Sequence, residues 1–568
     1  MLLLLLSASP GVPSVPPPVD AKAVALQKTL SAAAASGASS LTIPPGTYVF
    51  SNTDLLMQAS DLLIEAYNVT LVFYYGFGMQ LSQCHNVTVR GLTLDSDPPN
   101  YAQGVVAQML NSTAFVATFD ERFIPPDTSV QPFSAPGGTA GAKVQFWDAS
   151  SRLVLTGSVY NFMDSSRSLG GARWAIELKH PHQGPVPPEG SLVTVFPRRG
   201  VTFQVLNSSR VTAEDVTIHA GGNMGFLEVG GGGAHVYRRV AIARKPGSAG
   251  LMALNADGFH SKSVGVGPTL EDSTISFTGD DFVNVHGTML VVCKALSPSP
   301  AAVAMVEAAD DGDGDGDGDG DGDGDGDGDG DGDGDGGGDA AGPGSGASGA
   351  TSLAIIDVSG GSIEATRAGD TLSFYALEPG KQPALNVKLG AGVVRARQQI
   401  HDAATVKECH GASAAMQGPP WDAYLIVNTA TQPVYRVDFE EPLPPPVTAS
   451  RYNLANVERF TGAGATLRRN HFHDSCGSGG RILLKSRGAT FSSNVAARFG
   501  GLHVTTEQMW LEGDLGMGGV LVANNTLVDA HYAPPDPHVD VLAGLPNVSC
   551  VDTSFVWNGS RIFRASGC

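Results

Sequence analysis

A chain of 568 residues with 42% hydrophobic residues, 16% charged residues and 72 glycines can bury a large core, but it offers few salt-bridged helix surfaces. This composition favours an all-β architecture with many turns, and the length suggests two to four domains. The net charge of -21 becomes -6 when the 15 aspartates between positions 310 and 339 are left out. The rest of the chain therefore gives no sign of the basic patches that nucleic-acid binding needs, and we expect no nucleic-acid partner.

The first 18 residues resemble a secretory leader. Leu2 to Leu6, followed by small residues and prolines, are typical of the apolar region and cleavage zone of a signal peptide, although a positive segment is missing. Six cysteines permit disulfides, and Cys550 and Cys568 could close a C-terminal loop. We therefore expect a secreted or extracellular protein. We expect no membrane span, because no other apolar run is long enough.

Glycosylation sequons agree with a secretory route. Strings such as Asn-Val-Thr also occur at the turns of β-solenoids, so turn chemistry explains them equally well. The sequons begin at Asn68, Asn86, Asn111, Asn207, Asn524, Asn547 and Asn558.

The folded part is predicted to begin with a capping helix. Asp20 is a good N-cap, the segment from Ala21 to Ser36 is rich in alanine, and Gly37 suits a helix stop. Val24, Leu26 and Leu30 supply its apolar face. A strand segment, Leu41 to Phe50, follows. Such a helix would cover the open end of a β-solenoid, whose last coil otherwise exposes unpaired strands.

Short strands without helices then recur at a spacing in the twenties. Segments such as Val87–Leu94, Val211–Ile218, Leu270–Phe277 and Val520–Leu527 share apolar alternation around an Asn or Ser. This repeat predicts a parallel β-helix, in which each coil buries its strands by stacking on its neighbours. A sandwich or propeller would instead require many hairpins with Asn-Gly turns, which are scarce in this chain.

Two stretches interrupt this repeat and predict β-rich inserts of barrel or sandwich type. The second insert contains the Gly-Asp repeat, which lacks apolar residues, repels itself and should be disordered. The expected organisation is a leader at 1–18, β-helix at 19–104, insert at 105–199, central β-helix with the catalytic residues at 200–288, insert at 289–446 with the disordered part at 310–352, β-helix at 447–535 and a tail at 536–568.

Three aspartates are the candidate catalytic residues. Asp257 lies in Asn255-Ala-Asp-Gly-Phe-His260, and Asp280 and Asp281 lie about one coil later, in Thr278 to Gly287. Equivalent residues of stacked coils lie about 4.8 Å apart, so the carboxyl groups should gather on one patch. Glycoside hydrolysis needs one protonated and one ionised carboxyl group, and clustering raises at least one carboxyl pKa. Asp-Gly pairs also form ordinary turns, and strand alternation would point Asp281 inward unless the chain bends there.

Further polar residues are candidates for substrate binding. Asn255, His260, Asn284 and His286 flank the aspartates. Arg481 and Lys485 stand four apart in an apolar strand, and Trp510 lies between Glu507 and Glu512. Arginine and lysine could clamp hydroxyl groups or acidic sugars, and Trp510 could stack on a sugar ring. A solvated strand edge and a packed tryptophan explain this last group equally well.

Two families share these motifs. Asn255-Ala-Asp257, Gly279-Asp-Asp281, His286-Gly287 and Arg481 to Lys485 resemble the series of the polygalacturonases, with a longer Arg–Lys spacing. A wider resemblance is to glycoside hydrolase family 110, the α-1,3-galactosidases. It is carried by Leu94–Gly104, Ile218–Phe226, Ala256–His260, Asp280–Gly287, Gly480–Leu484 and Trp510–Gly513.

The family 110 resemblance implies a right-handed parallel β-helix of the pectin-lyase type with barrel inserts. It also implies an enzyme that removes terminal α-1,3-linked galactose with inversion, without a metal or other cofactor. Asp280 would be the general acid, and Asp257 with Asp281 would position and deprotonate water. The chain departs from the family pattern at Cys476–Gly480, before Arg481. The alternatives are a polygalacturonase-like hydrolase, a polysaccharide lyase, or a non-catalytic β-helix that binds glycans. The expected partner is a carbohydrate, and the sequence does not give the oligomeric state.

Overall fold

The structure is a computed structural model of the whole chain. It describes residues 20–51, 53–74, 77–129, 133, 142–155, 161–182, 184–296, 350–357, 362–376, 387–415, 432–449, 453–475, 480–507, 511–530, 539–541, 545–557 and 560–561. The expected leader at 1–18 and the Gly-Asp repeat lie outside these residues.

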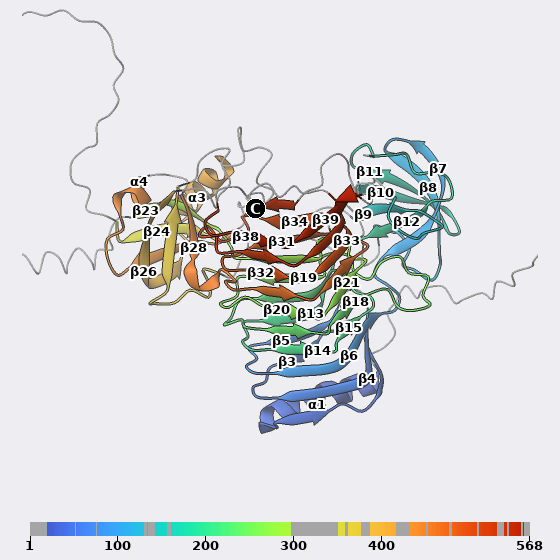
Figure 1. The fold of residues 1–568 in the computed structure, drawn as a ribbon, viewed down its shortest axis with the longest axis horizontal. Helices are drawn as coiled ribbons and strands as arrows, with labels where there is room; N and C mark the ends of the chain where they lie inside the picture. The colour runs from blue at the N-terminus through green and yellow to red at the C-terminus, as the bar shows by residue number, and fades with distance from the viewer. Residues whose placement is uncertain are drawn as a thin grey trace, which may run out of the picture.

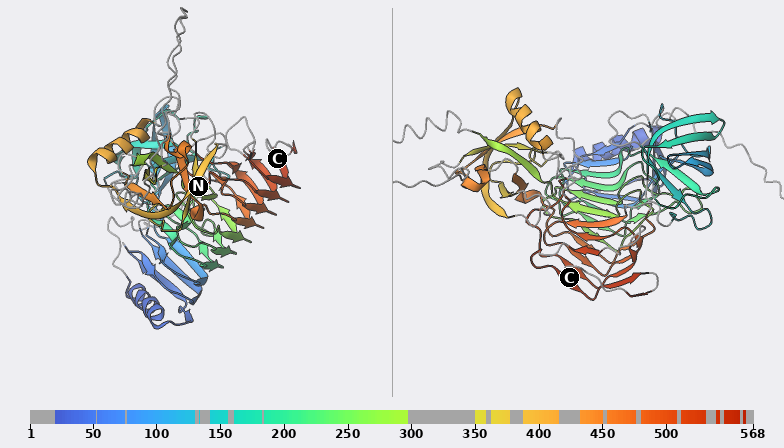
Figure 2. Two further views of the ribbon diagram at one scale, coloured as in Figure 1. Left: turned by 90° about the vertical axis from the view of Figure 1, so that its left-hand side faces the viewer. Right: turned by 90° about the horizontal axis from the view of Figure 1, so that it is seen from above.

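The chain forms a parallel β-helix, flanked on two sides by the inserts, and the fold prediction is confirmed (Figures 1 and 2). Each coil contributes strands to three faces. The first face consists of β3 (Leu55–Met57), β5 (Met79–Ser82), β13 (Val201–Leu206), β16 (Met224–Val229), β19 (Phe259–Lys262), β22 (Val283–His286), β31 (Arg481–Lys485), β34 (Gly501–Val504) and β37 (Val539–Val541).

The other two faces share the long strands β4 (Leu63–Phe73) and β6 (Thr88–Ser96). The second face also has β1 (Ser40–Thr42), β14 (Thr212–Glu214), β17 (Val236–Arg238), β20 (Thr269–Glu271), β29 (Thr466–Arg468), β32 (Thr490–Ser492), β35 (Leu521–Ala523) and β38 (Ser549–Val551). The third has β2 (Gly46–Phe50), β15 (Thr217–Ile218), β18 (Ala241–Ile242), β21 (Thr274–Ser276), β30 (His471–His473), β33 (Val495–Phe499), β36 (Thr526–Ala530) and β39 (Ser554–Trp557), to which β40 (Ser560–Arg561) pairs antiparallel.

The capping helix α1 (Ala21–Ser36) covers the N-terminal end of the β-helix, as expected (Figure 1). The Asp20 side chain accepts the Lys22 N–H at 3.0 Å, and Gly37 ends the helix with φ +65°. The buried face differs by one residue from the prediction. Ala23 packs inward with Leu26 and Leu30, whereas Val24 is 43% exposed, because it lies off the stripe that these three residues form.

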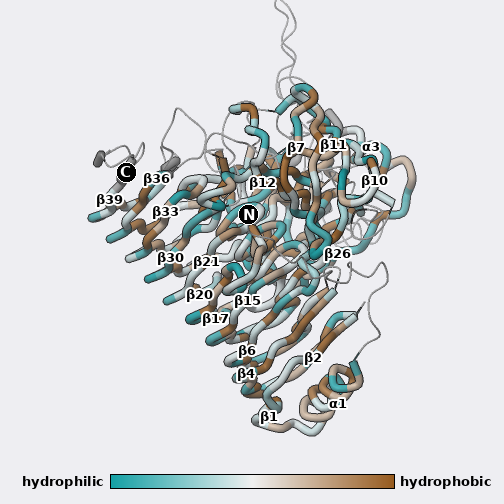
Figure 3. Tube along the Cα trace, turned by 90° about the vertical axis from the view of Figure 1, so that its right-hand side faces the viewer, coloured by the Kyte–Doolittle hydropathy of each residue, from teal (hydrophilic) through white to brown (hydrophobic). Residues whose placement is uncertain are grey.

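Apolar side chains of all three faces meet inside the coils, and hydrophobic stretches recur from coil to coil in Figure 3. Beneath the central part of the first face, an aromatic stack joins Phe203, Phe226, Tyr237 and Phe259, with successive ring centroids 4.7 to 5.4 Å apart. These contacts fix the depth at which β16 and β19 pack, since aromatic pairs favour tilted and edge-to-face geometry.

Both inserts contain closed barrels. The first consists of β7 (Ala102–Asn111), β8 (Ala114–Phe119), β9 (Lys143–Trp147), β10 (Asn161–Gly170), β11 (Arg173–Leu178) and β12 (Leu192–Phe196). The second consists of β23 (Leu290–Leu296), β24 (Ser352–Ile356), β25 (Thr371–Tyr375), β26 (Lys388–Gln399), β27 (Val434–Phe439) and β28 (Asn453–Val457), and α3 (Ala403–Ala415), α4 (Pro445–Ala449) and η3 (Glu458–Phe460) accompany it.

Three predicted boundaries need correction. The second insert extends beyond 446, because β28 closes its barrel by pairing with β23 and β25. The expected disordered part, 310–352, is wrong at its end, since residues 350–352 are described and Ser352 begins β24. The tail at 536–568 is not separate. Its strands β37, β38 and β39 continue the parallel stack, because pairing with the preceding coil overrides the weak apolar pattern of such short strands.

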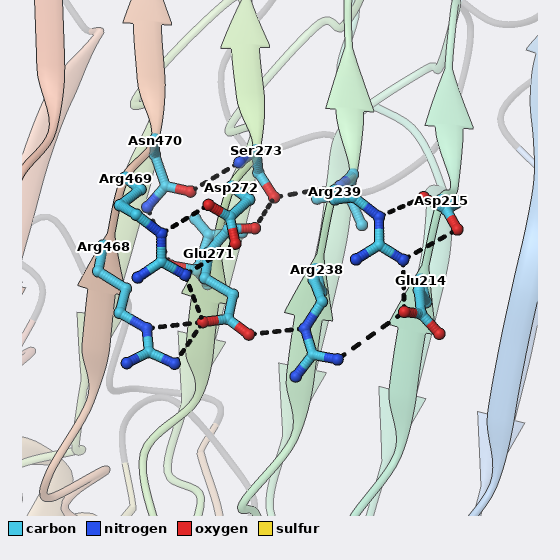
Figure 4. A network of polar contacts seen from close by, with 12 residues as sticks. Glu214, Asp215, Arg238, Arg239, Glu271, Asp272, Ser273, Arg468, Arg469 and Asn470 are labelled. Carbon is cyan, nitrogen blue, oxygen red and sulfur yellow. Dashed lines mark hydrogen bonds and ion pairs between the residues drawn. The ribbon is translucent and has the colours of Figure 1, made fainter.

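A ladder of alternating charges runs across the second face (Figure 4). Aligned positions of β4, β6, β14, β17, β20 and β29 carry Glu65, Arg90, Glu214, Arg238, Glu271 and Arg468. Glu271, whose side chain is 3% exposed, accepts from Arg238 at 2.6 Å and from Arg468 at 2.6 Å. Arg468 lies 197 residues after Glu271, so the ladder joins the coils before and after the second insert.

Glu228 of β16 is a buried acid inside the β-helix. Ser261 and Tyr237 donate hydrogen bonds to its two carboxyl oxygens at 2.5 and 3.1 Å. Burial raises the pKa of Glu228 to about 7, and the hydrogen bonds only partly oppose this. The folded protein therefore keeps a proton that the unfolded chain releases near its usual pKa, about 4.3.

The stability due to this proton is fully present below about pH 4.3 and should be lost as the pH rises from there through about 7, a change of about 4 kcal/mol. Glu228→Gln should weaken the pH dependence of stability. The melting temperature of the variant should therefore rise relative to that of the parent between pH 5 and pH 8. Parallel melting curves of the two proteins at several pH values measure this gain. Equal slopes would show that Glu228 does not titrate in this range.

Turn geometry accounts for most of the sequons. Asn68, Asn86, Asn207, Asn524 and Asn547 are exposed and adopt φ between +47° and +61°, a conformation that asparagine tolerates better than most residues. Cys550 is disulfide-bonded, and its partner lies outside the described residues. The described helices include none that is long and apolar enough to cross a membrane.

Candidate active site

The three predicted aspartates come together beside the first face. One carboxylate oxygen from each of Asp257, Asp280 and Asp281 lies within 4.8 Å of the others. Asp257 precedes β19 and the pair precedes β22, and the register aligns Phe259 with Val283. The coil equivalent of Asp257 is therefore Asp281, one residue later than the spacing estimate placed it.

A bend at the start of β22 allows both neighbours to join the cluster. Residues 279–282 lie outside the strand, so strand alternation does not send Asp281 to the opposite face. Two glycines permit close stacking of these loops. A Cβ on Gly279 would lie 2.5 Å from the Asn255 carbonyl oxygen, and one on Gly258 would lie 2.8 Å from that of Phe282. Any side chain at these positions would push the aspartates apart.

Asp281 and Asp257 each have a fixed polar partner. Arg481 donates from Nε and a terminal nitrogen to the two oxygens of Asp281, at 2.9 and 3.1 Å. Asp257 lies 2.7 Å from Nδ1 of His260. Burial alone would raise the pKa of Asp257, but the His260 hydrogen bond and the charges of His260 and Arg198 outweigh it and lower this pKa. Asp257 therefore suits the role of a base that stays ionised.

Asp280 contacts two cations that the sequence reasoning missed. Lys143 of β9 places Nζ 3.2 Å from its Oδ2, and Arg198, after β12, also contacts this oxygen. Both residues come from the first insert and its return to the β-helix. Lys143 begins the strand Lys143–Trp147, whose five residues are all buried, and it could have drawn attention, because a buried charged residue needs a specific partner. Burial, reinforced by Arg198, lowers the pKa of Lys143 well below its usual value.

These two contacts bear on the expected acid role of Asp280. A positive neighbour stabilises the carboxylate, whereas a general acid must carry a proton. The Asp280 side chain is the most exposed of the three, at 15%, and Arg198 is 37% exposed. The acid role thus requires that Arg198 moves away from Asp280 when substrate enters.

Arg198→Gln should test that requirement through the pH profile. Without the guanidinium, the protonated form of Asp280 should persist to higher pH, so the alkaline limb of kcat/KM should move upward. Arg199→Gln, one residue along, is the matched control. If the alkaline limb of Arg198→Gln coincides with that of the parent and the control, Arg198 does not influence the ionisation of Asp280.

A second group of acids surrounds Lys485. Its Nζ lies 2.5 Å from Glu507 and 2.6 Å from Glu512, and the lysine side chain is only 1% exposed. Burial lowers the pKa of Lys485, but the two carboxylates outweigh it and raise this pKa. Asn284 also donates to Glu512, at 3.2 Å. Lys485 is therefore placed to hold the two glutamates, and its own amine has little surface for substrate.

Asn255, another predicted binding residue, differs from the expectation in its location. Asn255 is fully buried and donates to the carbonyl oxygens of Asn100 and Pro197, both at 2.7 Å. It therefore ties the entry and exit of the first insert to the loop of Asp257, and it presents no surface to a substrate. Trp510 lies outside the described residues. His260, His286, Asn284, Arg481, Glu507 and Glu512 all lie around the three aspartates or the Lys485 group.

No family model and no curated protein sequence matches the chain. Solved structures that resemble it include the tailspike protein gp49 of Pseudomonas phage LKA1, with 13% identity, a TM-score of 0.14, and coverage of 47% of this chain and 50% of the other. Another is the gp54 tailspike of Acinetobacter baumannii bacteriophage AP22 in complex with capsular saccharide, with 7% identity, a TM-score of 0.14, and coverage of 94% and 55%. The chain thus matches about half the length of these two proteins, and the similarity concerns the fold alone.

Proposed function

We propose that the protein is a glycoside hydrolase that removes terminal α-linked galactose from glycans or polysaccharides. The observation that carries the proposal is the cluster of Asp257, Asp280 and Asp281, with three different sets of partners. Differently supported carboxyl groups can take different protonation states, as acid and base catalysis of glycosidic cleavage requires. Galactose as the sugar that is attacked and released rests on the resemblance to glycoside hydrolase family 110.

In the proposed reaction, Asp280 protonates the glycosidic oxygen while Asp257 and Asp281 orient and deprotonate the attacking water. The closest carboxylate oxygens lie within 4.8 Å. This is nearer to the roughly 5–5.5 Å between the carboxyl groups of retaining enzymes than to the roughly 6.5–9.5 Å of inverting ones. Inversion in this proposal therefore rests on the resemblance, and it must be measured directly.

A panel of α-galactosides, followed by NMR of the first sugar released, tests both parts. We expect release of galactose from an α-1,3-galactoside, with the β-anomer forming first. The α-anomer forming first would show retention and reassign one aspartate as a nucleophile. Absence of release from every member of the panel, by a folded protein, would contradict the galactosidase proposal and favour a β-helix that only binds glycans.

A uronic-acid substrate is the second candidate, because Lys143, Arg198 and Arg481 bring three basic side chains to the aspartates. Such groups could bind the carboxylate of an acidic sugar. Polygalacturonate belongs in the same panel. New reducing ends without a gain in ultraviolet absorption would indicate a polygalacturonase-like hydrolase, whereas new reducing ends together with an unsaturated product that absorbs ultraviolet light would indicate a lyase.

We also propose that the protein follows the secretory route, supported by the leader-like first residues and the disulfide of Cys550. Expression of the full chain with a C-terminal tag, followed by assay of medium and cells, tests this. Retention of all folded protein inside the cells would contradict it.

A further inference from the structure

Two buried histidines face each other beside Asp257. His260 of β19 and His286 of β22 lie on adjacent coils, with 7% and 0% of their surfaces exposed. Their Nε2 atoms are 2.9 Å apart, and the ring planes are nearly perpendicular, at 83°. The contact is therefore made by two ring nitrogens pointing at one another inside the protein.

The other nitrogen of each ring lies against an oxygen that can only accept a hydrogen bond. This oxygen is a backbone carbonyl for one ring and an ionised carboxylate for the other. Nδ1 of His286 lies 2.7 Å from the Gly287 carbonyl oxygen, and Nδ1 of His260 lies 2.7 Å from the Asp257 carboxylate. Each Nδ1 must therefore carry the hydrogen of its ring. If both rings are neutral, both Nε2 atoms present lone pairs to each other at 2.9 Å, which is repulsive. Such a contact needs a positive species between the two nitrogens.

Glu512 supplies a third ligand to the same point. Its Oε1 lies 3.6 Å from Nε2 of His286, whereas its other oxygen, Oε2, accepts from Lys485 and Asn284. One atom from each of His260, His286 and Glu512 lies within 4.8 Å of the others. Ligands about 2.0–2.1 Å from a tetrahedral zinc ion lie roughly 3.3 Å from one another, which is between the two measured separations.

The local charge agrees with a cation at this point. Asp257 and Glu512 are the carboxylates that lie against the imidazoles. Lys485 contacts Glu507 and Glu512, and Arg481 also contacts Glu507, at 3.6 Å. With the hydrogen on Nδ1, each ring offers the Nε2 lone pair that a metal ion needs. Histidines that bind a metal usually donate their other ring N–H to a carboxylate or carbonyl oxygen, which fixes the orientation of the ring, and both Nδ1 contacts here are of this kind.

We propose that His260, His286 and Glu512 bind a divalent cation of the zinc type. The ion would fix the His260 ring and, through it, Asp257. The ion therefore has a positioning role, and this role does not depend on which glycoside the protein cleaves. The site departs from the metal-free chemistry that the resemblance to family 110 implies.

Metal content of the full-length protein tests this site without an activity assay. Protein stripped with a chelator and reloaded with Zn²⁺ should keep about one equivalent through gel filtration, and Co²⁺ should give the visible absorption of a bound ion with nitrogen and oxygen ligands. Glu512→Gln and His286→Gln should each weaken Zn²⁺ binding at least about 10-fold. His471→Gln, an exposed histidine on β30, is the matched control and should bind as the parent does.

Several outcomes would overturn the site. Parent protein that keeps far less than one equivalent of Zn²⁺ would show that the imidazoles share a proton instead. Equal binding by the parent and both site variants would place the ion elsewhere, for example on the aspartates of the Gly-Asp repeat. If His286→Gln fails a thermal melting check, Glu512→Gln and the parent decide the question. Asp280→Asn should keep Zn²⁺ and lose hydrolysis, which separates this proposal from the hydrolase proposal.

Discussion

Replacing Asp280 by Asn is expected to lower kcat on an unactivated α-1,3-galactoside by about 10³-fold, because an amide of the same shape cannot protonate the leaving oxygen. The contacts of Asp280 with Lys143 and Arg198 favour the carboxylate in the absence of substrate, so this substitution also tests whether Asp280 is protonated during the reaction. Steady-state kinetics on the α-galactoside that the panel identifies provide the measurement.

The leaving group distinguishes lost proton donation from general damage. A substrate with an acidic phenol as leaving group needs little protonation, so Asp280→Asn should lose much less activity on it. Asp272→Asn changes an acid on the second face that is 38% exposed, and it should match the parent. Unchanged kcat in Asp280→Asn on both substrates would exclude Asp280 as the acid.

Replacing Glu271 by Lys should destabilise the β-helix more than any other single change in the charge ladder, by about 4 kcal/mol or more. The new ammonium would stand among Arg238, Arg468 and Arg469, which now bind the Glu271 carboxylate at 2.5 to 3.1 Å. Loss of a nearly buried carboxylate and repulsion among like charges act in the same direction. The melting temperature should fall by several degrees.

The partner strands allow a matched test. Asp272→Lys, at a position 38% exposed, should cost much less, because water screens its contact with Arg469. Combining Glu271→Lys with Arg468→Glu should recover part of the loss, because it restores opposite charges across β20 and β29. A double variant no more stable than Glu271→Lys would show that the ladder does not stabilise this junction.

Much of the fold could be predicted from the sequence because a parallel β-helix is built from local repeats. Each coil needs short apolar strands at a nearly constant spacing, and segments such as Val211–Ile218 and Leu270–Phe277 show this pattern directly. The tail was missed because β37, β38 and β39 are only three or four residues long, too short to show a period without their neighbours.

The candidate site was only partly predictable, because the coil repeat relates only some of its residues to one another. Coil spacing brings Asp257, Asp281, His260 and His286 together, since they belong to consecutive coils. Lys143 and Arg198 belong to another fold unit, and no repeat relates them to Asp280. Their approach depends on how the first barrel closes and returns the chain to the β-helix, which is a property of packing between units.

The sequence by itself determined that the chain coils into stacked parallel strands, begins with a capping helix and carries three aspartates on neighbouring coils, because these features depend on spacing and local pattern. The tertiary structure decided the bend that lets Asp281 join Asp280, the two cations that hold Asp280, and the contact between His260 and His286. It also decided the pairing of Glu271 with Arg468 across 197 residues. These features depend on which distant segments come into contact, and a register shift of one residue would turn each of these side chains to another face.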